Sequence, residues 1–213
     1  MSRPILYEYR RSSAAYRVRI ALNLKGVDYE SREVDLRTGA QRDPAYLAVN
    51  PFGLVPMLHI DGHQLTQSLA IITYLDTRFP NRPLIPAMAA YRAHVTAMAL
   101  SIACDIHPLN NLRVLQYLKN ELGHSQDEVD AWYRHWITTG LPGLEIQAKS
   151  LCGKFLFGDN PTGADVCLVP QLYNARRFDV PLDDYPTLLR AEENANKIEA
   201  FAAAHPDRQE VPA

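Results

Sequence analysis

Residues 9–24 read YRRSSAAYRVRIALNL and follow a short apolar stretch, residues 5–7, that predicts a β-strand. Apolar side chains three and four positions apart in the second half of the stretch predict a helix. Ser12 or Ser13 suits the N-cap of that helix, because a serine hydroxyl can accept a hydrogen bond from a free backbone N–H of the first turn. We therefore expect a strand, a tight turn and a helix here.

The start of this helix carries cations but no carboxylate. Four arginines, Arg10, Arg11, Arg17 and Arg19, crowd it. Cations at the positive end of a helix dipole are each unfavourable by about 0.3–1 kcal/mol, whereas an anion there is favourable. Two interpretations remain open: a turn that holds an anion with a hydroxyl aimed at it, or an ordinary capped helix with solvated arginines.

Composition and charge exclude several classes of protein. The 213 residues carry a formal net charge of −2, which argues against a nucleic-acid surface or a polybasic membrane patch. The first residues lack the apolar run of a signal peptide, and no stretch approaches the ~18 apolar residues of a membrane span. The three cysteines have no CxxC spacing, and no metal-ligand motif is present. We expect a cytoplasmic protein with buried thiols and without a metal, nucleic-acid or membrane partner.

A β-hairpin is the clearest element in the first half of the chain. Strand-like residues 57–60 and 63–66 flank an Asp-Gly pair that is typical of a two-residue type I′ turn. A second helix is predicted at residues 69–78, with Ser68 suited to its N-cap. Its first turn also lacks an acidic residue, so this half presents two helix N-termini without a competing carboxylate.

The order strand, helix, strand, loop, hairpin, helix predicts an α/β thioredoxin-like fold, with the second strand in residues 29–36 and the loop in residues 37–50. Strand signals almost vanish after residue 87, which predicts an all-helical second domain. We expect a thioredoxin-like domain at residues 1–82, a proline-rich linker at 83–88 and a helical domain at 89–213. The helices expected in the second domain span residues 90–120, 126–139, 144–151, 164–178 and 187–204.

Several further residues are candidates for chemistry or for structure. The Val55-Pro56 bond alone favours a trans turn, but a thioredoxin-like fold uses a cis-proline here to present backbone groups to an extended peptide. His107 and Asn111, spaced i and i+4, would face one side of a helix that Pro108 kinks or restarts. The alternative for His107 is an ordinary hydrogen-bonded helix histidine.

Two pairs of residues mark the ends of one predicted helix. Arg176-Arg177 lie at its C-terminus, either as functional cations or as a capping pair at the negative end of the dipole. Thr162 and Asp165 form a capping box at its N-terminus, which we interpret as structural.

Residues 11–22, RSSAAYRVRIAL, resemble the RSSCSxRVRIAL signature of the zeta-class glutathione transferases, the maleylacetoacetate and maleylpyruvate isomerases. Residues 50–56 and 67–71 resemble the family's glutathione-binding segment, and residues 104–111 and 164–178 its second-domain motifs. The resemblance covers nearly the whole chain. One departure is Ala14, which replaces a cysteine that is accessory to isomerisation in the family, so dehalogenation of small haloacids becomes doubtful.

The resemblance implies a homodimer that uses glutathione as its cofactor. It implies Ser12 as the catalytic serine. The negative charge that develops on the substrate needs cationic stabilisation. Our candidates for this role and for binding the substrate carboxylates are Arg11 and Arg177, with Arg176 in reserve. The implied contacts to glutathione are Ser12, Ser13, Val55, Pro56, Gln67, Ser68, His107 and Asn111.

The implied activity is cis–trans isomerisation of a maleyl diacid in aromatic catabolism, by reversible addition of the glutathione thiolate to the double bond. Maleylacetoacetate and maleylpyruvate remain open as substrates. The alternative is a glutathione transferase or dehalogenase that acts on small electrophiles. A non-catalytic interaction module is disfavoured because both serines are present, and a thioredoxin-type redox protein because no cysteine opens the first helix.

Overall fold

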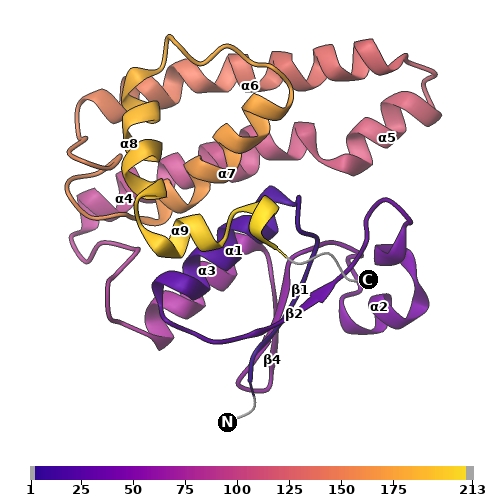
Figure 1. Ribbon diagram of the computed structural model, residues 1–213, viewed down its shortest axis with the longest axis horizontal. Coiled ribbons are helices and arrows are strands. Elements are labelled where there is room, and N and C mark those ends of the chain that lie inside the picture. The colour runs from indigo at the N-terminus through magenta and orange to yellow at the C-terminus, as the bar shows by residue number, and fades with distance from the viewer. Residues whose placement is uncertain (1–2, 210–213) are drawn as a thin grey trace. The chain divides into compact units, whose positions relative to one another are not determined.

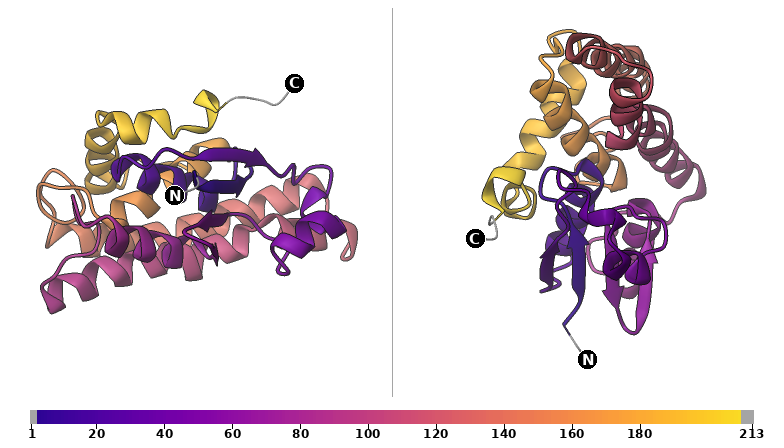
Figure 2. Two further views of the ribbon diagram at one scale, coloured as in Figure 1. Left: turned by 90° about the horizontal axis from the view of Figure 1, so that it is seen from below. Right: turned by 90° about the vertical axis from the view of Figure 1, so that its right-hand side faces the viewer.

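A computed structural model describes residues 3–209, which divide into two compact units (Figure 1). The first unit takes the chain up to Leu84 together with the residues from Asn196 onward, and the second runs from Ile85 to Ala195. We expected the last residues of the chain in the helical domain. They group with the first unit instead, because the short helix α9 (Glu199–Ala203) packs on the first helix of the chain (Figure 2).

A four-stranded mixed sheet forms the centre of the first unit, as the predicted thioredoxin-like fold requires. Its strands are β1 (Ile5–Glu8), β2 (Glu30–Glu33), β3 (Met57–Ile60) and β4 (His63–Thr66). The order is β2-β1-β3-β4, with β1 parallel to β2 and the other pairs antiparallel. The predicted hairpin is confirmed, and its two turn residues have φ of 51° and 80°, as a type I′ turn requires.

Two helices of the first unit begin at the same edge of the sheet. Strands β1 and β4 are both antiparallel to β3, so they run in the same direction. Helix α1 (Ser13–Leu24) follows β1, and helix α3 (Ser68–Arg78) follows β4. The two helices contact each other, and their N-termini therefore lie side by side.

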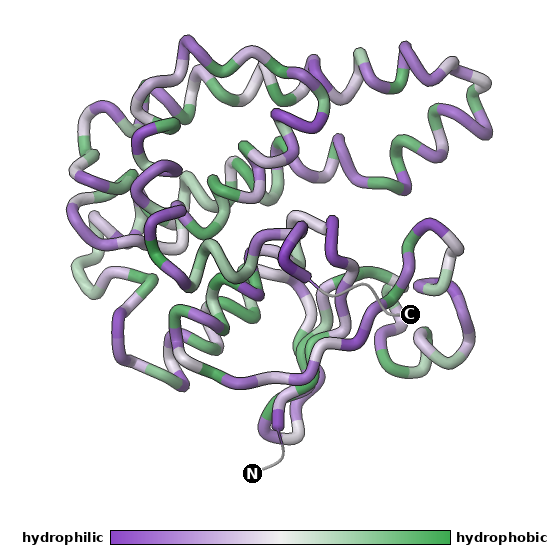
Figure 3. The backbone as a smooth tube through the Cα atoms, in the orientation of Figure 1, coloured by the Kyte–Doolittle hydropathy of each residue, from purple (hydrophilic) through white to green (hydrophobic). Residues whose placement is uncertain are grey.

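The two faces of β1 are covered by different elements. Leu6 is fully buried, whereas the ring of Tyr7 points the other way and lies 6.0 Å from the ring of Tyr46 in α2 (Pro44–Val49). Fully buried side chains of α1 and α3 complete the core, each contributing about 1.5–3 kcal/mol through burial. Figure 3 shows this pattern as green central strands and helices in which green and purple alternate.

Local features of the first unit differ from the expectation. The predicted loop at residues 37–50 contains a 3-10 turn, η1 (Ala40–Arg42), and α2, because Pro44 follows Asp43 and is pre-set for the first position of a helix. Strand β2 is shorter than predicted. A last 3-10 turn, η4 (Pro206–Arg208), follows α9.

The second unit is built from helices. They are α4 (Ala89–Leu100), the π-helix η2 (Ser101–Ile106), the 3-10 helix η3 (His107–Asn110), α5 (Leu112–Asn120), α6 (Gln126–Lys149), α7 (Gly163–Arg177) and α8 (Pro186–Asn196). Helix α7 is the core of the unit, since its first ten residues are all buried. Helix α6 approaches η2 closely at Gly140, where a Cβ would lie 2.4 Å from Ile106 Cδ1.

The predicted helix boundaries in this unit were partly wrong. The single helix expected at residues 90–120 is broken into four segments, and Pro108 restarts the chain in η3, as predicted for a residue without an N–H. The two helices expected at 126–139 and 144–151 form one, α6. Pro142 is tolerated inside α6 because Pro142 and Thr138 are exposed, so that water can reach the freed carbonyl. The last predicted helix divides into α8 and α9.

The cysteine prediction holds for one residue of three. Cys167 is buried, Cys152 is half-buried and Cys104 is exposed, and all three are free thiols. Among residues 3–209, no helix is both long and apolar enough to cross a membrane.

The predicted capping box at the start of α7 is confirmed. The Asp165 carboxylate accepts hydrogen bonds from the backbone N–H groups of Thr162 (2.8 Å) and Leu156 (2.9 Å) and from the Thr162 hydroxyl (2.9 Å). Its side chain is fully buried, and burial raises the pKa of the Asp165 carboxyl to about 6, although the three donors act in the opposite direction. The box therefore fixes the helix start at the cost of a desolvated carboxylate.

The raised pKa of Asp165 predicts a pH dependence of stability. A carboxyl with a raised folded-state pKa stabilises the fold most below its unfolded pKa, 3.8, and loses that contribution as the pH rises through about 6. The free energy of unfolding of the wild type minus that of Asp165→Asn should therefore fall as the pH rises from about 4 to about 6, by up to about 3 kcal/mol. Denaturant titrations at several pH values measure this difference.

Asp35→Asn is the matched control, because hydrogen bonds from Arg37 lower the pKa of Asp35 to about 2. The contribution of Asp35 should stay level over the same range. A difference for Asp165 that is level or rises with pH would contradict the prediction.

Candidate active site

Three segments of the first unit meet at one edge of the sheet. In the register, Tyr7 of β1 lies opposite Met57 of β3, and Met57 lies opposite Thr66 of β4. The turn after β1, the residues before β3 and the residues after β4 therefore lie close together. Seven of the predicted site residues come from these segments: Arg11, Ser12, Ser13, Val55, Pro56, Gln67 and Ser68.

Ser12 is the N-cap of α1, one of the two positions predicted. Its hydroxyl oxygen accepts from the N–H of Ala15 (3.2 Å), and its backbone N–H donates to the carbonyl of Tyr9 (2.8 Å), which closes a four-residue turn. Because the cap bond uses an oxygen lone pair, the hydroxyl hydrogen can still be donated to a ligand. Arg11 in the turn is exposed, and Ser13 is buried.

The arginines of this stretch divide into two kinds. We expected all four to crowd the helix start, and this was wrong for two of them, because α1 is buried on nearly every face. Arg19 is fully buried and pairs with Glu8. Arg17 is 1% exposed and donates to the Ser68 hydroxyl (3.3 Å), which ties the start of α3 to α1. Arg17 thereby places a buried positive charge between two helix starts that have no acidic residue in their first turns.

The start of α3 differs from the prediction in one respect. Gln67, not Ser68, is the N-cap, and Ser68 is the first helical residue. Gln67 has φ of 67° and ψ of 117°, a conformation that costs a residue other than glycine about 1–3 kcal/mol and is held by its surroundings. Its side chain is exposed and makes no cap bond, so it is available to a ligand at this helix end.

Val55-Pro56 is a cis peptide bond, the isomer expected in a thioredoxin-like fold. The preceding carbonyl, that of Leu54, accepts from the Tyr46 hydroxyl and from the Asn50 side-chain amide, both at 2.7 Å. The sequence analysis missed Tyr46 and Asn50 as residues that hold this segment. The sequence feature that could have identified them is Asn50 directly before Pro-Phe-Gly, which is typical of a turn. In that turn Gly53 has φ of +60°, and a Cβ added to it would lie 3.0 Å from a backbone oxygen.

In the second unit, His107 and Asn111 do not share a helix face. His107 begins η3, whereas Asn111 is extended (φ −67°, ψ 142°) and caps α5 by accepting from the N–H of Arg113. The i, i+4 argument was therefore wrong, because Pro108 ends the regular helix between them.

Arg176 and Arg177, at the end of α7, have different environments. Arg176 forms a two-pronged ion pair with Glu192 of α8, with both N–O distances 2.5 Å, and this partner raises the pKa of Arg176. Arg177 is exposed, and its guanidinium lies 5.8 Å and 5.7 Å from the ring centroids of Tyr173 and Phe178. The charge of Arg176 is thus paired within the second unit, whereas the charge of Arg177 is exposed to solvent.

The first-unit residues fit an extended peptide that carries a thiol and a carboxylate. The acid-free start of α3, with Ser68 and the buried Arg17, suits a carboxylate, and the backbone at Val55 suits a peptide. The Ser12 hydroxyl and the dipole of α1 favour a thiolate over a thiol, whose ordinary pKa is about 8.5. Glutathione has these three groups. The described residues contain no cluster of His, Cys, Asp or Glu that could hold a metal ion.

Comparison with known proteins places this geometry in a family. The model of the glutathione S-transferase N-terminal domain matches residues 3–77. A probable maleylacetoacetate isomerase of Vibrio cholerae is 51% identical over 208 residues, 96% of each chain. A maleylpyruvate isomerase of Ralstonia is 41% identical over 206 residues, 96% of this chain and 97% of that protein.

A solved holo structure of a maleylpyruvate isomerase, a bacterial glutathione S-transferase of the zeta class, matches with a TM-score of 0.95 at 41% identity, over 98% of this chain and 100% of that one. A maleylacetoacetate isomerase from Methylobacterium extorquens with bound malonate and glutathione matches over the same shares, with a TM-score of 0.94 at 40% identity. The chain therefore belongs to the glutathione transferase family, in the zeta class of maleylacetoacetate and maleylpyruvate isomerases.

Proposed function

We propose that this protein is a glutathione-dependent cis–trans isomerase of a maleyl diacid, either maleylacetoacetate or maleylpyruvate. One observation carries the proposal: the Ser12 hydroxyl lies at the acid-free start of α1, at the same sheet edge as Val55 and the start of α3. This arrangement suits a tripeptide whose thiol is ionised beside Ser12. Close relatives across the full length of the chain carry the names of these two isomerases.

Bound glutathione supplies the thiolate that adds to the cis double bond and leaves again after rotation about the resulting single bond. Ser12 donates its hydroxyl hydrogen to the sulfur and so keeps it ionised. Arg11 and Arg177 bind the substrate carboxylates and stabilise the negative charge that develops on the substrate. The acid-free helix starts avoid repulsion of both anionic molecules.

The remaining assignments concern binding. We assign the γ-glutamyl carboxylate to Gln67 and Ser68, and the peptide backbone to Val55 and Pro56. Ser13, His107 and Asn111 are further contacts to glutathione. Between the two arginines of α7, Arg177 is the stronger candidate for the substrate because Arg176 already pairs with Glu192.

We further propose a homodimer in the reducing cytoplasm. Dimerisation follows the family, and Phe52, which is 71% exposed in the loop before β3, offers an apolar side chain to a second copy. The three free thiols support a reducing compartment. Ala14 is buried in the first turn of α1, so this helix start lacks the thiol associated with dehalogenation.

The proposed function is tested by progress curves for the two maleyl diacids, each with and without glutathione. Isomerisation should require glutathione but leave its concentration unchanged, because the thiolate is released in every cycle. A chlorinated aromatic compound is the comparison substrate. Glutathione consumed in proportion to that compound, with no isomerisation of either diacid, would favour the transferase alternative.

Ser12→Ala removes the proposed partner of the thiolate. Turnover should fall by about 10²–10³-fold while glutathione still binds, because the other contacts remain. Steady-state kinetics and a binding isotherm for glutathione measure the two effects. Ser125→Ala is the matched control, since it removes the N-cap serine of α6 and costs about 1 kcal/mol of stability with no loss of turnover. Unchanged turnover in Ser12→Ala would remove Ser12 from the mechanism.

Arg177→Ala should raise the KM for the diacid far more than the KM for glutathione, by about 10-fold or more, because it deletes a charged contact to a carboxylate. Arg176→Ala, measured in parallel, should destabilise the fold but alter the KM for the diacid little. Equal effects of Arg177→Ala on both KM values, or a larger effect of Arg176→Ala, would count against this assignment.

A further inference from the structure

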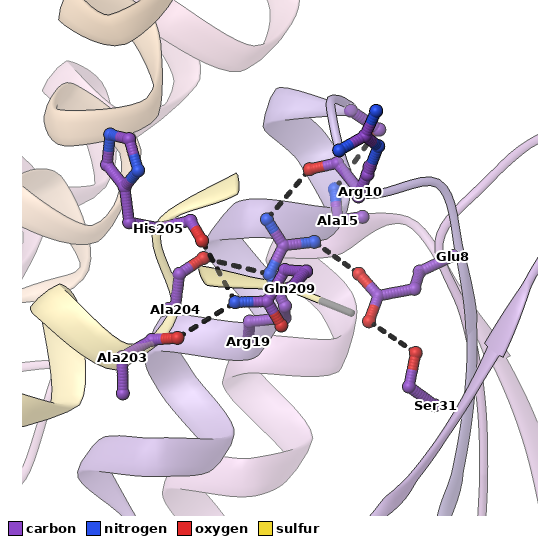
Figure 4. A network of polar contacts seen from close by, with 10 residues as sticks. Glu8, Arg10, Ala15, Arg19, Ser31, Ala203, Ala204, His205 and Gln209 are labelled. Atoms are coloured by element: carbon purple, nitrogen blue, oxygen red, sulfur yellow. Dashed lines mark hydrogen bonds and ion pairs between the residues drawn. The ribbon is translucent and has the colours of Figure 1, made fainter. Parts of the chain in front are cut away.

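The side chain of Arg19 joins three segments of the first unit that are distant in sequence (Figure 4). Nη1 pairs with the carboxylate of Glu8, Nη2 donates to the carbonyl of Arg10 (3.0 Å), and Nε donates to the carbonyl of Ala204 (2.9 Å). The arginine is 0% exposed, and Glu8 is 2% exposed. A cation at such depth needs its partners, because an unpaired buried charge is strongly destabilising.

Further hydrogen bonds fix two of the segments to which Arg19 binds. The second oxygen of Glu8 accepts from the Ser31 hydroxyl of β2 (2.9 Å). The segment after α9 is closed by Gln209, whose side-chain amide donates to the carbonyls of Ala203 (2.8 Å) and His205 (2.9 Å) (Figure 4). Arg19 therefore rests against rigid neighbours on the sheet and on the C-terminal segment, residues 199–209.

The third partner, the carbonyl of Arg10, belongs to the turn that carries Ser12. The hydrogen bond from the N–H of Ser12 to the carbonyl of Tyr9 makes the peptide between Arg10 and Arg11 the central peptide of a four-residue turn. In type I and type II turns this central peptide points in opposite directions, and either can close the same hydrogen bond. Arg19 binds the oxygen of this very peptide.

We propose that Arg19 is a positioning residue that fixes the central peptide of the active-site turn and so aims Arg11 and Ser12, with the C-terminal segment as part of its support. A flip of this peptide would take an acceptor away from a buried guanidinium. One orientation is thereby selected before any ligand binds. This inference rests on the proposed function, because it assigns Arg19 to the orientation of the proposed catalytic groups.

A second buried ion pair lies at the C-terminal end of α1. Lys25, at the other end of α1, pairs with Asp76 of α3 (2.7 Å) and donates to the carbonyls of Asn81 (3.1 Å) and Arg82 (3.0 Å). Its side chain is as buried as that of Arg19, but none of its partners lies in the turn. Lys25→Met is therefore a matched control for the loss of a buried cation.

The test compares Arg19→Lys, Arg19→Met and Lys25→Met with the wild type in the full-length protein. The pKa of the thiol of bound glutathione is read from the ultraviolet absorbance of the thiolate as the pH is varied. Turnover is expressed per glutathione-binding site, and thermal unfolding reports stability. Arg19→Lys keeps a cation beside Glu8, but an ammonium group cannot reach the three acceptors that the planar guanidinium binds. This variant therefore separates the effect of the charge from the effect of the turn's orientation. It also keeps the test possible if Arg19→Met does not fold.

In Arg19→Lys the bound thiol should return toward its free pKa and turnover per site should fall about tenfold, the factor that corresponds to one pKa unit. Lys25→Met should lower the unfolding temperature and leave both quantities unchanged. A wild-type thiol pKa and turnover in folded Arg19→Lys, or an equal shift in Lys25→Met, would overturn the inference. A wild type that does not lower the pKa of the glutathione thiol would instead contradict the proposed function.

Discussion

Strands β1 and β4 run in the same direction, and the candidate site depends on this constraint. Each strand is followed directly by a helix, so the starts of α1 and α3 are brought to one edge of the sheet. Strand β3, between them, runs the other way, and its first residues enter from the same edge. Three short segments that are far apart in sequence therefore form one surface of backbone N–H groups and hydroxyls without a catalytic loop of unusual length.

Two buried arginines connect the segments that form this surface. Arg17 connects the starts of α1 and α3 through Ser68, and Arg19 connects β1, the turn and the C-terminal segment. Both side chains are desolvated, so their charges act in a medium of low dielectric constant, where electrostatic interactions are stronger than in water. Arg17 therefore adds a buried positive charge beside the two helix starts, whereas the charge of Arg19 is paired with Glu8.

In the second unit, too, a buried charged side chain holds a helix in place. Helix α7 is buried from its capping box onward, and the desolvated carboxylate of Asp165 fixes where it begins. Its other end carries two neighbouring arginines. The pairing of Arg176 with Glu192 orients the last turn, and Arg177 remains exposed beside aromatic rings. Adjacent identical residues therefore have different environments because their partners differ.

The sequence by itself determined the fold class, the hairpin and its turn, the capping box at Asp165 and the two helix starts without acidic residues, and it limited the N-cap of the first helix to Ser12 or Ser13. These features depend on local patterns of apolar residues, turn dipeptides and side-chain to backbone hydrogen bonds, which act over a few residues. The resemblance to the family rested on the same short motifs.

Only the tertiary structure decided which arginines of this stretch are buried. Arg10, Arg11, Arg17 and Arg19 look alike in the sequence, but Arg19 turns inward because Glu8 and the carbonyl of Ala204, 185 residues away, are there to receive it. The positive φ of Gln67 is likewise held by its surroundings and not by a local sequence motif. Such contacts leave no periodic signal in the chain, since each depends on where another element packs.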